Sequence, residues 1–401
     1  MPAIAIQPDI YWVGVNDHIT DLFEGLWPIT REGVSYNSYL INADKKALVD
    51  LAKSNKVDEF FDRISEITDI SGLDYIILNH MEPDHTGVLK LLRELAPKAE
   101  ILCSAKAVAM VKNFFGISDN VRVVTDGEEL DLGGKKLKFY MTPFIHWPET
   151  MMTYETGSQI LFSCDGFGGY GSLRGDIFDG DYTDYEFYEK EALRYYANIV
   201  ASFSTQVLKA INSLSDIPVS IIAPSHGLVW RKNPGRIIEL YKKWAEYASN
   251  HGEPAVTVIY GSMYGNTLAI MDSVAQGLSS TGISVEMFDV ARTHGSYILP
   301  SIWSKQGVVL GAPTYEARLF PPAAHFLDLA ERKGMRHKKF AYFGSYGWSG
   351  GARRELDQRI DSLKWEMVDA YDFAGGPTLD DFSKGELLGK KFGELILSGK
   401  K

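Results

Sequence analysis

The chain has 401 residues, which is enough for two domains with complete hydrophobic cores. Hydrophobic residues make up 45% of the sequence and charged residues 23%, as in an ordinary globular protein. The net charge of -11 and the pI near 5.4 argue against non-specific binding to nucleic acid. No run approaches the roughly 20 apolar residues of a membrane helix, and the N-terminus lacks the basic and apolar regions of a signal peptide. We therefore expect a soluble, cytoplasmic protein that binds neither nucleic acid nor membranes.

Strand-like and helical patterns alternate along the chain and divide it in two. Residues 10–52 alternate in strand fashion, notably in Ile10–Val15 and Ser35–Ile41, and long helical patterns occupy 187–213 and 234–247. The segment Asn250–Pro254 breaks the pattern, so we expect domains at 1–252 and 253–401. The second domain repeats a strand–helix alternation that predicts a doubly wound parallel sheet, with strands near 255–260, 284–290, 306–311, 338–344 and 365–370.

Four metal-binding side chains follow the apolar run Tyr75–Leu78 within six residues: His80, Glu82, Asp84 and His85. Because Pro83 cannot donate to a strand ladder or continue a helix, we expect the cluster on an irregular turn that aims its side chains at two neighbouring ions. A solvated loop would explain this cluster equally well if it stood alone.

Three further candidate ligands lie near the ends of apolar strands, where open sheets present functional groups. His146 stands in the proline-flanked loop Pro143–Glu149, while Asp165 and His226 end the runs Ile160–Asp165 and Val219–His226. A hydrogen-bonded loop histidine or a capping aspartate would explain any one of them. Four histidines and three carboxylates at strand ends together indicate a metal site.

This ligand set resembles the metallo-β-lactamase superfamily and, within it, the flavodiiron proteins. The spacing matches: 60 residues lie between His85 and His146, 18 between His146 and Asp165, and 60 between Asp165 and His226. Zinc hydrolases of the superfamily carry histidine where this chain has Glu82. Added carboxylates are hard, anionic ligands that suit iron cycling between ferrous and ferric states better than zinc.

The resemblance implies an N-terminal αββα sandwich with a diiron site. It assigns His80, Glu82 and His146 to one iron, Asp84, His85 and His226 to the other, and Asp165 to a bridge between them. In some members the residue at the position of His85 is not bound to the metal. No catalytic residue beyond the metal and flavin ligands is implied.

Three loops in the last third of the chain predict a flavin mononucleotide (FMN) site. The first joins the strand Ala255–Tyr260 to a helical pattern at 268–279, and it contains hydroxyl and glycine residues but no lysine, so it is not a nucleoside triphosphate loop. It resembles the phosphate loop of flavodoxins, and the ends of two later strands occur where flavodoxins bracket the isoalloxazine ring. An ordinary strand–helix turn and aromatic packing are the alternatives. The predicted FMN-binding residues are Ser262, Met263, Tyr264, Gly265, Asn266, Thr267, Pro313, Thr314, Tyr315, Ser345, Tyr346, Gly347 and Trp348.

Two other features limit the chemistry. Gly166–Gly171 satisfies the G-x-G-x-x-G dinucleotide pattern, but no helical stripe follows until about residue 187, so we interpret these glycines as allowing close backbone passage beside Asp165. Cys103 and Cys164 are the only cysteines, which excludes a built-in rubredoxin-type site and predicts buried thiols. Electrons must then arrive from a separate donor.

The resemblance implies an oxidoreductase that reduces dioxygen to water, nitric oxide to nitrous oxide, or both, and we favour dioxygen. The donor would be rubredoxin or a reduced deazaflavin, and the active unit would be a head-to-tail homodimer in which Trp147 faces the flavin of the partner or packs in the core. A primary nitric oxide reductase, a zinc hydrolase fused to a flavodoxin and a non-enzymatic electron carrier are the alternatives. Many members carry histidine at the position of Glu24, so this residue is predicted to affect proton delivery or gas preference.

Overall fold

The computed structural model describes residues 2–181 and 183–399 and divides into two compact units, Met1–Lys243 and Trp244–Lys401. Both units are mixed α/β, as predicted, and each is described by itself. The division falls inside helix α7 (Pro234–Asn250), so the domain boundary expected at residues 252–253 stays a proposal. Within the described ranges, no helix is long and apolar enough to cross a membrane.

Two sheets form the centre of the first unit. The seven-stranded sheet is antiparallel at its β1 edge and parallel from β8 onward. In order it contains β1 (Ile4–Gln7), β2 (Ile10–Trp12), β7 (Tyr39–Asn42), β8 (Lys46–Val49), β9 (Tyr75–Leu78), β10 (Glu100–Cys103) and β11 (Val121–Val123). The five-stranded sheet contains β12 (Glu129–Asp131), β13 (Lys136–Met141), β14 (Met151–Glu155), β15 (Ile160–Cys164) and β16 (Ile221–Pro224).

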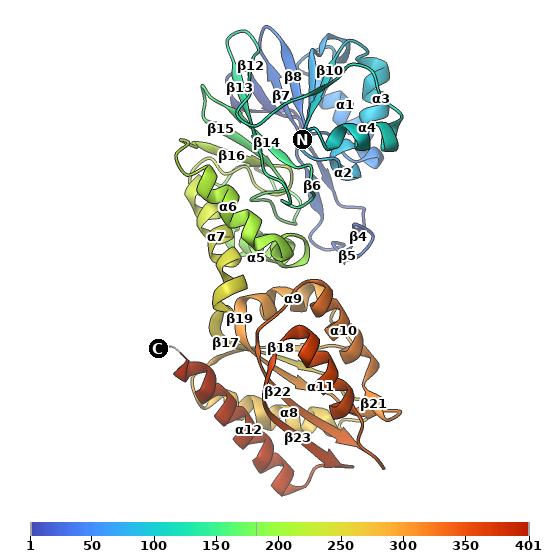
Figure 1. Ribbon diagram of the computed structural model, residues 1–401, viewed down its shortest axis with the longest axis vertical. Helices are drawn as coiled ribbons and strands as arrows, with labels where there is room; N and C mark the ends of the chain where they lie inside the picture. The colour runs from blue at the N-terminus through green and yellow to red at the C-terminus, as the bar shows by residue number, and fades with distance from the viewer. Residues whose placement is uncertain (1, 182, 400–401) are drawn as a thin grey trace. The chain divides into compact units, whose positions relative to one another are not determined.

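Helices cover the outer faces of these sheets. Figure 1 shows α1 (Val57–Ser65), α3 (Leu89–Leu95) and α4 (Ala107–Phe115) beside the seven-stranded sheet, and α5 (Tyr185–Tyr195) and α6 (Ser204–Ser213) beside the five-stranded one. The arrangement is the predicted αββα sandwich. The remaining short elements are the ribbons β3 (Val15–Asp17) with β6 (Val34–Tyr36) and β4 (Leu22–Phe23) with β5 (Trp27–Pro28), the one-turn helix α2 (Pro83–Thr86), and the 3₁₀ turns Ser54–Lys56 and Ile70–Gly72.

Two elements that the sequence predicts to be continuous, a strand and a helix, are interrupted in the structure. The strand expected at Ile10–Val15 is split into β2 and β3 at Gly14, where an added Cβ would lie 2.5 Å from the Tyr36 carbonyl oxygen. The helix expected over 187–213 contains a π-helical turn at Tyr196–Val200 and a 3₁₀ turn at Ala201–Phe203. Apolar spacing does not locate the π-helical turn, because all five of its residues are buried and the segment therefore shows no single apolar face.

The second unit contains a five-stranded parallel sheet in the order β18-β17-β19-β22-β23. The second strand in sequence lies on one side of the first, and the later strands lie on its other side. This order is that of flavodoxins. The strands are β17 (Glu253–Tyr260), β18 (Ser284–Asp289), β19 (Lys305–Gly311), β22 (Lys339–Tyr346) and β23 (Glu366–Ala374), with a small hairpin of β20 (Thr314–Tyr315) and β21 (Arg318–Leu319).

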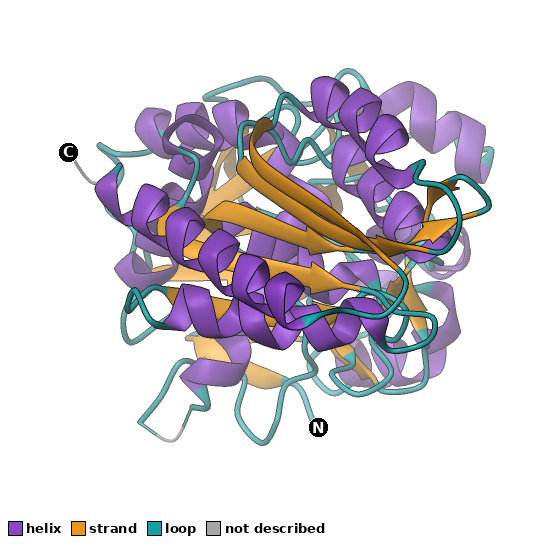
Figure 2. Ribbon diagram, turned by 90° about the horizontal axis from the view of Figure 1, so that it is seen from below, coloured by secondary structure: helices purple, strands orange, loops and turns teal. Residues whose placement is uncertain are grey.

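Helices lie on both faces of the strands, as Figure 2 shows. They are α8 (Asn266–Ser279), α9 (Gly295–Ser304), α10 (Pro321–Arg332), α11 (Ala352–Leu363) and α12 (Leu379–Ser398). Helices α8 and α12 approach each other through glycine: a Cβ added at Gly277 would lie 2.0 Å from the Glu386 carbonyl oxygen, and one at Gly389 would lie 2.1 Å from that of Val274. Apolar residues of both helices then pack on the sheet.

Side chains of the second unit hold the end of α7 and the connection that follows it. The Trp303 indole Nε1 donates to the Trp244 carbonyl oxygen at 3.0 Å. The buried Lys338 ammonium donates to the carbonyl oxygens of His251, at 2.8 Å, and Trp303, at 3.1 Å. Gln306 Nε2 donates to the carbonyl oxygen of residue 252 at 2.9 Å. We name these three side chains, Trp303, Gln306 and Lys338, the α7 clamp.

We expect the free energy of unfolding to depend on pH because of Lys338, the lysine of the α7 clamp. Burial, followed by the nearby charge of Lys305, lowers the pKa of Lys338 to about 7 from the ordinary 10.5. The unfolded chain therefore binds this proton more tightly, and between pH 7 and 10 the free energy of unfolding should rise with pH, by up to about 1.4 kcal/mol per unit. Lys338→Met should flatten this slope. Urea unfolding of both proteins at several pH values measures it, and equal slopes would contradict the expectation.

Candidate metal centre and flavin pocket

One segment after β9 presents four of the candidate ligands. All four residues of β9 are buried, so the chain emerges from the core directly before His80. The irregular turn predicted around Pro83 is wrong: Pro83 is the first residue of α2, with Glu82 at the N-cap and Asp84 and His85 inside the turn. Proline is favoured at this position because its fixed φ suits a helix and its missing N–H would have no helical partner there.

The other three ligands come from the five-stranded sheet. Strands β15 and β16 are parallel neighbours, so Asp165 and His226, which follow them, lie at the same edge. His146 is further from a strand end than expected, because it lies in the loop between β13, which ends at Met141, and β14. Thr150 closes that loop by donating its hydroxyl to the Thr142 carbonyl oxygen at 2.6 Å.

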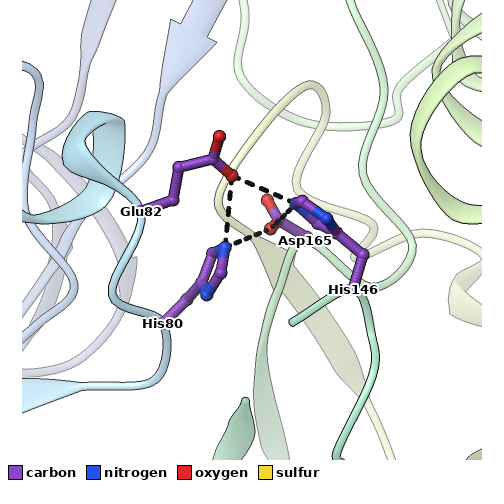
Figure 3. A group of neighbouring side chains, drawn as sticks. All are labelled: His80, Glu82, His146 and Asp165. Atoms are coloured by element: carbon purple, nitrogen blue, oxygen red, sulfur yellow. Dashed lines mark hydrogen bonds and ion pairs between the residues drawn. The ribbon is translucent and has the colours of Figure 1, made fainter. Parts of the chain in front are cut away.

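The first group of side chains is His80, Glu82, His146 and Asp165, all buried or nearly so (Figure 3). Glu82 Oε2 lies 3.3 Å from His80 Nε2 and 3.1 Å from His146 Nε2. Asp165 Oδ2 lies 3.4 Å from each of the same two nitrogens. The four ligand atoms thus converge on one point.

The second group is Asp84, His85 and His226. Asp84 Oδ1 lies 3.4 Å from His85 Nε2, and its Oδ2 lies 3.3 Å from His226 Nε2. The Asp165 carboxylate also reaches this group, through its other oxygen: Oδ1 lies 3.1 Å from His85 Nε2 and 3.4 Å from His226 Nε2. Asp165 therefore stands between the two groups with one oxygen toward each.

The carboxylates and histidines of the site shift one another's pKa values. Burial raises the pKa of Asp165, but the surrounding histidines outweigh burial and hold this pKa well below its usual range. Burial lowers the pKa of His146 and His226, but their carboxylate neighbours outweigh it and raise these values to about 9 and about 10. Asp165 is therefore ionised at neutral pH, the form in which a carboxylate binds metals.

The outer nitrogens of two histidines are fixed by partners. His80 Nδ1 is bonded to Glu149 Oε1 at 2.8 Å, and His226 Nδ1 donates to the Ser35 carbonyl oxygen at 2.7 Å. Both contacts leave Nε2 to face the site, as in most protein metal sites. Neither Glu149 nor Ser35 was predicted. Glu149 lies three residues after His146 in the same loop, which is the signal that identifies it in retrospect.

Orphaned polar atoms show that the site suits cations. Asp84 and Asp165 each have two buried carboxylate oxygens without a hydrogen-bond partner, and His226 Nε2 and both ring nitrogens of His85 are buried in the same condition. Buried polar atoms without partners are rare and costly. Metal ions would satisfy them, and the mixture of imidazole and carboxylate donors fits iron.

Aromatic residues surround the second group. Phe23 and Tyr195 lie 5.4 and 5.7 Å from the His226 ring between ring centroids. Glu24, at the tip of the same β4–β5 hairpin, is exposed and accepts a hydrogen bond from Trp27 Nε1 at 2.9 Å. Trp147 is half-buried, with its ring 5.0 Å from that of His80.

The glycine-rich segment after β15 does not open a helix. The next helix, α5, begins at Tyr185, so the dinucleotide interpretation is excluded as expected. A Cβ added at Gly168 would lie 3.1 Å from the Asp165 carbonyl oxygen and 3.3 Å from that of His226. The glycine thus permits the close backbone passage that the sequence suggested.

The second unit holds a pocket of about 390 Å³, a size that is typical of ligand sites, at the ends of β17, β19 and β22. Eleven of the predicted FMN residues line it, and Glu316 and Gly375 are additional lining residues. Gly375 follows β23, so the fifth strand contributes as well, and its pairing with the carbonyl oxygen of Tyr346 at 2.8 Å fixes it there. Trp348 and Tyr264 are 90% and 89% exposed at this pocket.

The remaining two predicted residues, Gly265 and Thr267, shape the loop without lining the pocket. Gly265 has φ +93° at the N-cap of α8, a conformation that favours glycine. The buried Thr267 hydroxyl is bonded to that of Ser345 at 3.0 Å, which joins the first loop to the third. Ser262 Oγ accepts from the N–H of Gly265 at 3.1 Å. The N-terminus of α8 therefore faces the loop, as in an anion site.

Each of the two units matches the model of a known protein family. The model of the ODP family beta lactamase matches residues 34–227, and that of flavodoxin matches residues 258–386. The anaerobic nitric oxide reductase flavorubredoxin of Salmonella arizonae is 37% identical over 385 residues, which cover 94% of this chain and 79% of that protein.

Solved structures extend the likeness to the whole chain. The rubredoxin oxygen:oxidoreductase of the anaerobe Desulfovibrio gigas superimposes with a TM-score of 0.93 at 27% identity, covering 99% of both chains. A variant of the flavo-diiron protein of Thermotoga maritima has a TM-score of 0.90 at 32% identity and also covers 99% of both. The chain belongs to the flavodiiron protein family.

Proposed function

We propose that this protein is an oxidoreductase that takes electrons from an external donor through FMN to a diiron site, where it reduces dioxygen to water. The placement of Asp165 carries the proposal, because a single carboxylate with one oxygen toward each ligand group can be shared by two metal ions. The pocket in the flavodoxin-like unit supports FMN as the second cofactor.

The ligand assignment follows the two groups. His80, Glu82 and His146 would hold one iron and Asp84, His85 and His226 the other, with Asp165 between them. Two ferrous ions and a reduced flavin together supply the four electrons that dioxygen needs. The protein's own residues fix the histidine tautomers through Glu149 and Ser35, and Phe23 and Tyr195 limit water beside His226.

A combined cofactor and gas experiment tests this function. Protein expressed anaerobically with added iron should contain about two irons and one FMN per chain, by analogy with two-metal sites. After anaerobic reduction, stopped-flow exposure to dioxygen should reoxidise the flavin. Stoichiometric zinc without iron would favour a zinc hydrolase. A reduced flavin that is reoxidised by neither dioxygen nor nitric oxide would favour an electron carrier. Either result would refute the proposal.

Nitric oxide is the second candidate substrate. The flavorubredoxin relative is named a nitric oxide reductase, whereas the D. gigas structure is named an oxygen oxidoreductase. Reducing two molecules of nitric oxide to nitrous oxide takes two electrons, so the same site could perform it. Steady-state rates with each gas decide the preference. Glu24, the candidate for influencing it, would be compared with Glu24→His in the same assay.

We further propose a head-to-tail homodimer as the active unit and rubredoxin or a reduced deazaflavin as the donor. A two-fold interface repeats one patch, so it would bring both flavins to the partners' irons at once. The exposed Trp348 and Tyr264 at the flavin pocket support a surface that becomes covered, since large aromatic side chains gather at interfaces. Trp147 would face the partner's flavin from the metal side.

Mixing two inactive variants tests the dimer. Asp165→Ala removes the bridging ligand, and Thr267→Asp adds a negative charge in the first turn of α8, where it would repel the flavin phosphate. After exchange of equal amounts, half of the dimers would pair one intact flavin with one intact metal site, so activity should return to roughly a quarter of wild type, as expected for isologous pairing. Verified exchange without recovery would show that electrons pass within one chain.

A further inference from the structure

We infer that Glu149 is a positioning residue for the first metal position: it fixes the His80 ring and, through that ring, favours the ferric state of the iron held there. The inference rests on the proposed diiron function and assigns a role to a residue outside the ligand set.

The geometry places the Glu149 carboxylate directly behind His80. Oε1 lies 2.8 Å from His80 Nδ1 and accepts the backbone N–H of Met81 at 3.1 Å. His80 is fully buried, and Glu149 is 2% exposed, so water does not compete for this contact. Because Nδ1 is occupied as a donor, the lone pair of Nε2 is directed toward Glu82 and Asp165.

The chemistry of this acceptor differs from that behind His226. The partner of His226 Nδ1 is a neutral carbonyl oxygen, that of Ser35, whereas His80 has a buried carboxylate. A carboxylate draws the Nδ1 proton more strongly and makes the ring a more basic, more electron-donating ligand. Such a ligand stabilises the higher charge of ferric iron, so the two metal positions should differ in reduction potential, with the first the lower.

The loop that carries Glu149 links it to the second imidazole of the same metal position. His146 lies three residues earlier, and the Trp147 ring between them packs 5.0 Å from the ring of His80. The loop is held at its end by Ser104, whose hydroxyl donates to the Glu149 carbonyl oxygen at 2.7 Å. Movement of Glu149 would therefore disturb His80 and His146 together.

Two substitutions separate charge from position. Glu149→Gln keeps an oxygen that can accept from both His80 and Met81 but removes the negative charge. Glu149→Ala removes the contact altogether. Glu155 provides the matched control, because it is also a fully buried carboxylate that accepts backbone N–H groups, from Gly157 at 2.9 Å and Ser158 at 2.7 Å, and it lies outside both ligand groups.

The readouts are iron affinity, by competition with a chelator under anaerobic conditions, and the potential of the diiron centre, by a redox titration followed by electron paramagnetic resonance. Glu149→Gln should keep two irons and FMN but lower the preference for ferric iron about tenfold, which is a rise of about 59 mV for one electron. Glu149→Ala should weaken binding of one iron 10- to 100-fold, by the usual effect of losing such a partner. Glu155→Gln should lower thermal stability and leave affinity and potential unchanged.

The outcomes distinguish the inference from the proposed function. If wild type binds two irons and Glu149→Gln has the same potential and affinity, the role of Glu149 is wrong while the diiron function stands. If Glu155→Gln shifts the potential as much as Glu149→Gln does, the effect is general to buried carboxylates and the inference is again wrong. If wild type binds no iron, the proposed function itself fails.

Discussion

Replacing Asp165 with alanine should lower turnover with either gas at least about a thousand-fold, which corresponds to an activation free energy higher by about 4 kcal/mol. The reason is geometric, because Oδ1 and Oδ2 of this one carboxylate lie within 3.4 Å of histidine nitrogens in different ligand groups. Without it, each group loses a ligand and the two lose their shared contact. FMN should remain bound, since its pocket is built from the other unit.

Metal analysis, flavin absorbance and gas consumption measure this result together. Asp179→Ala is the matched control: Asp179 is equally buried in the same unit but accepts backbone N–H groups, among them that of Asn233 at 2.8 Å. The control should lose stability yet keep both irons per folded chain. Full iron content and turnover in Asp165→Ala would contradict the bridging assignment.

The variant Glu82→His should abolish gas reduction, with at least a hundred-fold loss of turnover, while FMN binding stays intact. Glu82 Oε2 stands between His80 Nε2 and His146 Nε2, so an imidazole there would give the first metal position three nitrogen ligands. Such a set suits zinc, and it removes one of the two anionic donors, Glu82 and Asp165, that stabilise ferric iron at this position.

Anaerobic expression with equal amounts of iron and zinc measures the selectivity, and stopped-flow flavin reoxidation measures the turnover. Glu82→Asp is the conservative comparison, because it retains the charge on a shorter side chain and should keep part of the iron and part of the rate. Unchanged dioxygen turnover in Glu82→His would show that the charge at this position does not matter.

The sequence predicted both architectures and the seven candidate ligands that the structure brings together, because most of them lie close to a strand end and strand ends meet at a sheet edge. Asp165 and His226 illustrate this, since they follow parallel neighbours. His146 was placed less accurately: its position depends on how the loop after β13 folds back and closes on Thr150, which no local pattern encodes.

Other features depended on long-range contacts. The bond between Glu149 and His80 joins residues 69 positions apart, and no local pattern predicts how the two loops that carry them align. The turn at Pro83 was misjudged for a different reason, since proline ends a helix when it is interior but begins one when it is first. The π-helical turn in 187–213 was missed because its five residues are all buried, so no one-sided apolar stripe marks the inserted residue.

The α7 clamp has a consequence for dissecting the protein. A flavodoxin-like fragment cut at Glu253, where the strand β17 begins, would lack the backbone acceptors of Trp303 Nε1 and, in part, of Lys338 Nζ. A buried ammonium without its carbonyl partner is costly. Such a fragment would expose the surface around Trp303 and Lys338 to water, so it should fold less stably. A fragment that starts at Trp244 keeps these acceptors. Transplanting the flavin module onto another protein would thus require carrying the last two turns of α7 with it.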